Sequence, residues 1–277
     1  MRLGVRAHDF GKLPVGELAG RIAREGFRCV QLAPPKAIAG FDAASTRLDA
    51  AAAGGVRAAF EAAGIQIAVL GCYINPVDPD PNRRGRQLAQ FKEYVRRARD
   101  FGCGVVGTET GSLNADFSFH PGNRGEGAFQ TLVGSVRELV GEAERCGVAV
   151  GIEGVERYVI SDARRMKRLI DAIGSARLQV IFDPVNLLSA ANYARQDDII
   201  KESFELCGDR IAILHAKDFV VDAGGLRSVL AGKGRLNYGL VAELCRAGKS
   251  SADILMEDTN PATVAEGVRF LRSVFSI

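Results

Sequence analysis

The chain has 277 residues, of which 47% are hydrophobic and 25% charged, and its formal net charge is +3. A charge this close to neutral gives no reason to expect a nucleic-acid or acidic-membrane partner, and no apolar run approaches the roughly 18 residues that a membrane helix needs. The six cysteines form no CxxC pair, which is typical of a reduced compartment and indicates the cytoplasm.

Short apolar runs rich in β-branched residues recur along the whole chain and predict strands. In order, they cover residues 3–6, 29–32, 65–70, 104–107, 148–152, 178–182, 211–214 and 253–256. Each run is too continuously apolar for a half-exposed sheet, and this pattern is typical of parallel strands covered by other elements.

Helical patterns separate these strands. Residues 15–25 carry an apolar face opposite a charged one, and residues 129–143 form the strongest helical pattern of the chain. Residues 87–100 expose a basic face, which we interpret as solvated rather than as a phosphate track. A weaker helix is expected over residues 46–63, because Gly54 and its glycine neighbour interrupt it.

Strand and helix therefore alternate along the chain, and the simplest closed arrangement is a single (β/α)8 barrel domain over residues 1–277. A doubly wound open sheet is the alternative, but no GxGxxG motif follows the first strand to support it. Functional groups of such a barrel gather at the C-terminal ends of the strands. The loops 74–85, 111–125 and 219–237 are expected on that rim, where they could wall a pocket.

Four of the later strands end on a residue of a metal-ligating type. These residues are Glu153, Asp183, His215 and Glu257. Any one of them could cap a helix or pair with an arginine, but successive units of a barrel would bring all four around one mouth. Three carboxylates and an imidazole suit Mn²⁺, Mg²⁺ or Co²⁺ better than a structural zinc. The set therefore predicts one divalent ion, with Mn²⁺ as first choice and Zn²⁺ as a further alternative.

The motifs around these residues resemble the xylose isomerase-like TIM barrel superfamily, which includes sugar phosphate isomerases and epimerases. The resemblance runs over nearly the whole chain. It rests on residues 151–153, 182–186, 214–218, 232–238 and 256–257, which read GIE, FDPVN, LHAKD, GKGRLNY and ME.

The resemblance implies a metal-dependent isomerase or epimerase of a sugar or a sugar derivative. In the isomerase and epimerase branches, Glu153 and Glu257 would bind the ion and also act as the acid/base pair. One would remove the proton beside the carbonyl and the other would return it through an enediolate. An inosose dehydratase-like lyase on the same metal site and a non-catalytic metabolite-binding barrel remain the alternatives.

Further rim residues are expected to contact a small sugar or polyol substrate, without a nucleic-acid or membrane partner. They are His8, Gln31, Cys72, Glu109, Asn186, Lys217 and Asp218. Asn186 stands where several ketose epimerases carry a histidine, and an amide can donate to a sugar hydroxyl but cannot take a proton near neutral pH. The sequence leaves the substrate open, and a monomer and a homo-oligomer are equally compatible with it.

Overall fold

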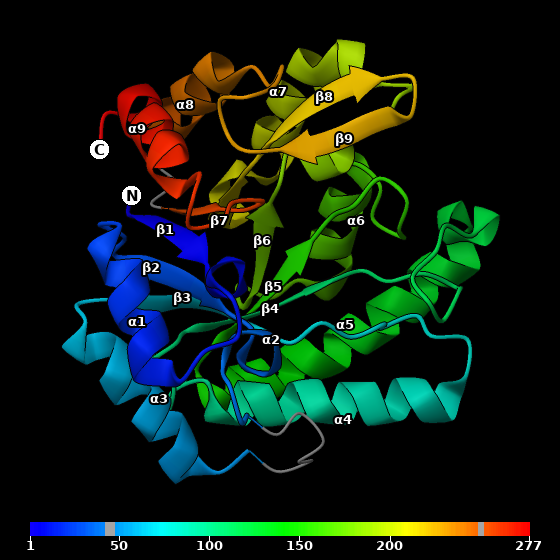
Figure 1. Ribbon diagram of the computed structural model, residues 1–277. Helices are drawn as coiled ribbons and strands as arrows, with labels where there is room; N and C mark the ends of the chain where they lie inside the picture. The colour runs from blue at the N-terminus through cyan, green and yellow to red at the C-terminus, as the bar shows by residue number, and fades with distance from the viewer. Residues whose placement is uncertain (42–47, 249–251) are drawn as a thin grey trace.

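The computed structural model describes residues 1–41, 48–248 and 252–277. Parallel strands of this part of the chain form a closed eight-stranded barrel (Figure 1). The barrel strands are β1 (Leu3–Arg6), β2 (Cys29–Leu32), β3 (Gln66–Gly71), β4 (Val105–Glu109), β5 (Ala149–Glu153), β6 (Leu178–Phe182), β7 (Ile211–Ala216) and β10 (Asp253–Met256). Each strand pairs with its predecessor in this order, and β10 closes the ring on β1. The predicted (β/α)8 fold is confirmed.

Amphipathic helices cover the outside of the barrel. They are α1 (Val15–Arg24), α3 (Ala50–Ala62), α4 (Pro81–Arg97), α5 (Glu126–Cys146), α6 (Ala163–Ile173), α7 (Gln196–Cys207), α8 (Tyr238–Ala247) and α9 (Val264–Phe275). A short helix α2 (Pro34–Ala37) follows β2. In α1 the apolar face predicted from the sequence is buried, with Leu18 and Ile22 fully inaccessible. Among the described residues, none of these helices combines the length and the apolar character that a membrane crossing requires.

Two helices differ from the prediction at their N-terminal ends. Helix α3 runs unbroken through Gly54, and its N-cap is Asp49, which accepts from the Ala51 amide at 3.1 Å. The predicted first residues, 46 and 47, lie outside the described part of the chain. Helix α4 begins before residue 87 because Asp80 caps it and Pro81 occupies its first turn. The predicted rim loop 74–85 is correspondingly shorter.

Small residues make room for a packed barrel interior. Its core consists of Cys29, Val69, Ile181, Ile213 and Leu255. A Cβ at Gly107 of β4 would lie 2.7 Å from the Ile181 Cδ1 atom, so this glycine is needed for the close packing. The barrel is therefore filled below its mouth, and the C-terminal rim is the expected place for a ligand.

The rim segment 219–237, predicted as a loop, contains an antiparallel hairpin. Strands β8 (Asp218–Asp222) and β9 (Gly225–Val229) pair with each other and project beyond the barrel strands, as the yellow and orange arrows of Figure 1 show. Residues of β9 are mostly half-exposed, so the segment lacks the continuous apolar run that marks the barrel strands. The hairpin is a correction to the predicted loop.

Candidate active site

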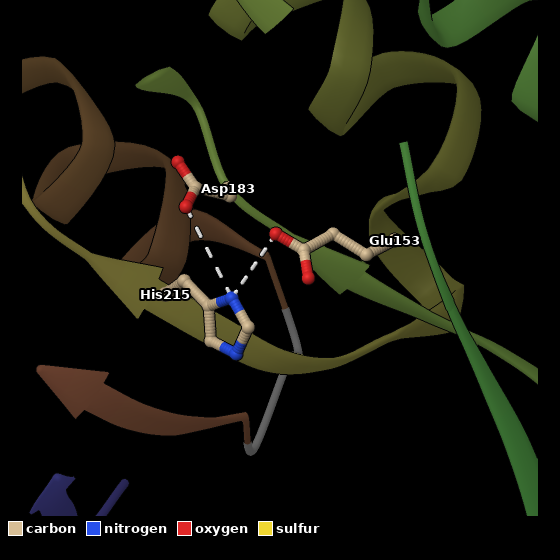
Figure 2. Close-up of side chains that lie close together, drawn as sticks. All are labelled: Glu153, Asp183 and His215. Carbon is tan, nitrogen blue, oxygen red and sulfur yellow. Dashed lines mark hydrogen bonds and ion pairs between the residues drawn. The ribbon is translucent and has the colours of Figure 1, made fainter. Parts of the chain in front are cut away.

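Three of the predicted ligands meet at the C-terminal end of the barrel. Glu153 ends β5, Asp183 follows β6 directly, and His215 lies in β7. Figure 2 shows the three side chains pointing toward one another, and one ligand atom of each lies within 4.8 Å of the others. The His215 Nδ1 atom is 3.2 Å from Glu153 Oε1 and 4.0 Å from Asp183 Oδ2. All three side chains are buried.

The local backbone orients Asp183. Its Oδ1 atom accepts from the amides of Val185 at 2.9 Å and Asn186 at 3.0 Å, which closes a tight turn after β6. The Oδ2 atom faces the site and accepts no aligned hydrogen bond from any described residue, although Lys217 Nζ lies 2.8 Å away.

The opposite side of His215 is held by a hydrogen-bond chain. Its Nε2 atom lies 2.6 Å from Gln31 Oε1, and the Gln31 amide nitrogen donates to the hydroxyl of Tyr73. Since Gln31 Oε1 can only accept, Nε2 carries a proton and Nδ1 faces the carboxylates. Burial disfavours the charged imidazole, but the charges of Glu257 and Glu153 outweigh it and raise the pKa of His215 to about 9.

The donor set fits a divalent ion. Two buried carboxylates and an imidazole nitrogen converge, with Asp183 Oδ2 4.0 Å from His215 Nδ1. Oxygen ligands with one imidazole suit Mn²⁺, Mg²⁺ or Co²⁺, and Zn²⁺ also accepts this set. Glu153, Asp183 and His215 could therefore hold such an ion.

Glu257, the fourth predicted ligand, lies beside this triad. Its Oε1 atom is 3.5 Å from His215 Nδ1, whereas Oε2 lies 3.3 Å from both Lys217 Nζ and Arg6 Nη1. Burial opposes its ionisation, but the charges of His215, Lys217 and Arg6 hold the pKa of Glu257 well below its usual range. Glu257 is thus an ionised carboxylate, and its place as a ligand stays a prediction.

Lys217 is a buried cation between two carboxylates. Its side chain is 9% exposed, and its Nζ atom contacts Asp183 at 2.8 Å and Glu257 at 3.3 Å. Burial lowers the pKa of Lys217, and the charges of Asp183 and Glu257 more than offset this and raise it above its ordinary value. The ammonium therefore stays charged and compensates part of the negative charge of the site.

A cavity of about 390 Å³ opens above these groups at the barrel mouth. Its wall includes six of the residues predicted from the sequence. They are His8, Glu109, Glu153, Asn186, Lys217 and Glu257. The Asn186 Nδ2 atom donates to Glu153 Oε1 at 2.6 Å, so this amide orients the carboxylate.

Glu109 stands in register with Glu153 on the neighbouring strand. Burial and the charges of Glu153 and Glu257 raise the pKa of Glu109 to about 7. A carboxyl group that titrates near neutral pH on a cavity wall is suited to giving and taking protons.

The structure differs from the prediction at three expected substrate residues. In the described part of the chain, Gln31 lies behind His215, Cys72 lies in the hydrophobic core, and neither lines the cavity. Asp218 accepts from the backbone amides of Phe219 at 2.8 Å and Leu236 at 2.8 Å, so it shapes the rim loop. Gln31 and Asp218 therefore act from outside the cavity wall, through His215 and the rim loop.

Tyr73 takes the place on the wall that the sequence suggested for Cys72. Successive side chains of an extended segment point to opposite sides, so a shift of one residue exchanges the core for the cavity. Arg6, Lys36 and Arg157 also line the cavity and were not predicted. Arg6 could have been found, because it is the last residue of β1 and so lies at the functional rim.

Comparison with known proteins identifies a TIM barrel family and a relative with a sugar-epimerase name. A profile of the xylose isomerase-like TIM barrel family matches residues 20–274. A D-psicose 3-epimerase of Enterocloster bolteae is 25% identical over 177 residues, which are 62% of this chain and 54% of that protein. The match thus spans about half the length of this curated relative.

Solved structures with sugar-epimerase names share the architecture. A D-tagatose 3-epimerase-like protein superposes with a TM-score of 0.78 at 17% identity, covering 100% of this chain and 97% of that chain. The 3-keto-D-glucoside 4-epimerase of E. coli superposes with a TM-score of 0.75 at 18% identity, covering 99% of both chains. At this level of identity the likeness shows the fold.

Proposed function

The chain belongs to the xylose isomerase-like TIM barrel family, and from this membership we propose that it is a divalent-metal-dependent epimerase or isomerase of a keto-sugar or a sugar derivative. The names of the relatives, which include D-psicose 3-epimerase and D-tagatose 3-epimerase-like protein, support this class of substrate. The proposed reaction moves a proton on the carbon beside a carbonyl group, through an enediolate.

The observation that carries this proposal is the pair of glutamates on one cavity wall. Glu153 and Glu257 come from different strand ends, and their Oε1 atoms lie 3.2 Å and 3.5 Å from the same nitrogen of His215. Both border the cavity at the barrel mouth. Two carboxylates that reach one bound substrate could remove a proton and return one to the same carbon.

A carboxylate alone is too weak a base for this step, because a proton beside a carbonyl is only weakly acidic. We propose that Glu153, Asp183, His215 and Glu257 hold one divalent ion, with Mn²⁺ as first choice. When bound, such an ion stabilises the negative charge that develops on the enediolate oxygens. Mg²⁺, Co²⁺ and Zn²⁺ are the alternatives that a metal titration separates.

The remaining proposed roles are proton transfer and contact with the substrate, and side chains of this chain supply both. Glu257 is ionised, because the charges of His215, Lys217 and Arg6 lower its pKa, and so it is free to accept a proton in one direction of the reaction. The same lowering makes it a weak base, so removal of the proton depends on the substrate being made more acidic. Glu153 would serve the other direction, and Asn186 Nδ2 holds its Oε1 atom at 2.6 Å. Tyr73 accepts from Gln31, so its own hydroxyl proton is free for a substrate oxygen.

The test is proton exchange in D₂O with the full chain, added Mn²⁺ and a panel of ketoses, followed by NMR and mass spectrometry. The parent protein should exchange the proton beside the carbonyl and form an isomer of unchanged mass. The isosteric Glu257→Gln variant should lose about 10²- to 10⁴-fold in rate, whereas Glu266→Gln, which removes a carboxylate on the exposed surface, should not.

Other outcomes would replace the proposal. A product that has lost water would indicate a lyase of the inosose dehydratase kind. Full exchange in Glu257→Gln would exclude this glutamate as the acid/base group. Sugar binding without any exchange across the panel would identify a metabolite-binding barrel.

A further inference from the structure

A second cavity of about 400 Å³ adjoins the one above the glutamates. The two share Arg157 and Asn186 in their walls, so they lie side by side at these residues. We propose that the second cavity binds a further, neutral sugar ring of the substrate, which would make the substrate a keto-sugar with two rings. This inference rests on the proposed function, because the first ring must be the one that reacts.

Size is the first argument. Small-molecule sites in proteins take about 300–1,000 Å³, and the first cavity of about 390 Å³ alone reaches this range. A single hexose over Glu153 and Glu257 would leave the second cavity empty. A second ring joined to the first would fill it without leaving the cleft.

The walls of the second cavity are built into the fold. The loops after β5 and β6 are joined where the Glu156 amide donates to the Asn186 carbonyl oxygen at 2.7 Å. The facing wall is strand β9, whose Ser228 hydroxyl donates to Asp258. Asp258 in turn accepts from Arg6 at 3.1 Å, and Arg6 also contacts Glu257. The hairpin wall is therefore tied to the catalytic rim by side-chain contacts.

The lining has the mixed character that a sugar ring needs. Val185, Leu188 and Leu226 present apolar surface, on which the C–H face of a ring can pack. Ser189 and Ser228 line the same cavity. The Ser189 hydroxyl can donate to a ring hydroxyl or accept from one, whereas Ser228, which donates to Asp258, can only accept. A lining of this kind favours a hydroxyl-rich ring over a purely apolar group.

Charge argues for a neutral ring. Glu156 and Arg157 both line the second cavity, so each sign of charge is present once among the lining residues. Glu156 is paired with Arg124, whose Nη2 atom also donates to its carbonyl oxygen at 3.1 Å. An anionic group would find one guanidinium here, but it would also meet a carboxylate on the same wall.

Arg157 stands where the two rings would join. Its guanidinium lies 5.1 Å from the ring centre of Tyr158, and Nη2 donates to the Tyr158 hydroxyl at 3.3 Å. Within the described residues it forms no ion pair with a carboxylate, so several of its donors stay available. They are positioned for the oxygen that links the rings.

The experiment is a calorimetric comparison on the full chain loaded with Mn²⁺. Sorbitol and maltitol are the probes, because neither has a carbonyl group and both can bind without reacting. Maltitol should bind about tenfold more tightly than sorbitol, the difference that one additional set of ring contacts can provide. Equal affinities would overturn the inference, and so would tighter binding of sorbitol 6-phosphate than of maltitol.

Two tryptophan variants test the place of the second ring. Leu226→Trp fills the second cavity, and the affinity ratio of maltitol to sorbitol should fall to about one. Leu244→Trp is the matched control, because Leu244 is also a half-buried leucine on an open cavity, between α7 and α8. If Leu226→Trp does not fold, Ser189→Trp fills the same space. An unchanged ratio in a folded cavity variant would overturn the inference.

A turnover measurement separates this inference from the proposed function. D-fructose and isomaltulose, a glucosyl-fructose, are compared by proton exchange in D₂O. If neither exchanges while maltitol keeps its tenfold advantage, the proposed reaction fails and the second ring site stands. If both exchange with equal KM and maltitol has no advantage, the second ring site fails and the proposed reaction stands.

Discussion

Gln31 Oε1 lies 2.6 Å from His215 Nε2 and so connects strand β2 to strand β7, which are not neighbours in the barrel. The Gln31 amide nitrogen in turn donates to the Tyr73 hydroxyl. This chain holds the imidazole with Nδ1 toward Glu153. A residue expected to touch substrate therefore orients a proposed metal ligand.

We predict that Gln31→Leu weakens Mn²⁺ binding by about 10- to 100-fold, the usual cost of losing a group that orients a metal ligand. Gln31→Glu should retain much of the affinity, because a carboxylate oxygen can accept from Nε2. Gln179→Leu removes another strand glutamine and serves as the control. Calorimetry with Mn²⁺ gives the affinities. Unchanged Mn²⁺ affinity in a folded Gln31→Leu variant would contradict the proposal that Gln31 orients His215 for the ion.

Metal binding should raise thermal stability, and Asp183→Asn should abolish this gain. Binding to the folded state alone stabilises it by about 2.7 kcal/mol at a ligand concentration of 100 times Kd. The amide oxygen of an asparagine can keep the backbone bonds of Oδ1, while the charge at Oδ2 is lost. Melting curves with Mn²⁺ and with EDTA measure the effect. Asp171→Asn, on the exposed surface, should keep the full metal-induced rise in Tm.

Lys217→Met should destabilise the metal-free protein. Removing one partner of a buried ion pair typically costs about 3–5 kcal/mol, and here Asp183 and Glu257 would both lose their buried cation. Added Mn²⁺ should restore part of this loss, because it brings positive charge back to the carboxylates. Urea unfolding measures both values, and Lys233→Met at an exposed ion pair is the control. Equal stability of the two variants would count against the role of Lys217.

His8 should make the protein less stable as the pH falls. Burial, together with the charges of Arg6 and Lys36, lowers the pKa of His8 to about 4, whereas an unfolded histidine titrates near about 6.5. As the pH falls, the unfolded chain thus binds this proton before the folded protein does. The contribution of neutral His8 to the free energy of unfolding is complete above pH ~6.5 and is lost as the pH falls toward ~4. His8→Gln should flatten the decline of the unfolding free energy in this window.

The control for this pH dependence is His120→Gln, since His120 lies outside the cavity wall and caps a turn through Gly122. Urea unfolding at several pH values between about 7 and 4 compares the two variants with the parent. A decline in His8→Gln as steep as in the parent would assign the pH dependence to other groups.

Gly107→Ala should lower stability by about 1–3 kcal/mol, the usual cost of overpacking a core. Its added methyl group would lie 2.7 Å from Ile181 and 2.8 Å from Val69 inside the barrel. Gly134→Ala in α5 meets no atom within 4 Å and should instead stabilise the protein. Urea unfolding of both variants measures these changes. Equal unfolding free energies of Gly107→Ala and Gly134→Ala would show that the barrel interior can relax around the added methyl group.

Local patterns were sufficient for the architecture. Buried parallel strands leave continuous apolar runs, and each barrel strand overlaps its predicted run. The same pattern located the strand ends, because a polar residue after an apolar run marks the point where the chain reaches the rim. Glu153, Asp183 and His215 were found in this way, and the structure brings them within 4.8 Å of one another.

The amino-acid sequence by itself thus determined the barrel, its functional rim and the residue types that gather there, because these follow from hydrophobic periodicity and strand order. Only the tertiary structure decided which side chains face the cavity, since a shift of one residue moves a side chain from wall to core, as at Cys72 and Tyr73. It also decided the contacts between distant segments, such as Gln31 with His215 and Ser228 with Asp258. Such contacts depend on distances across the closed barrel, and no local pattern in the chain encodes them.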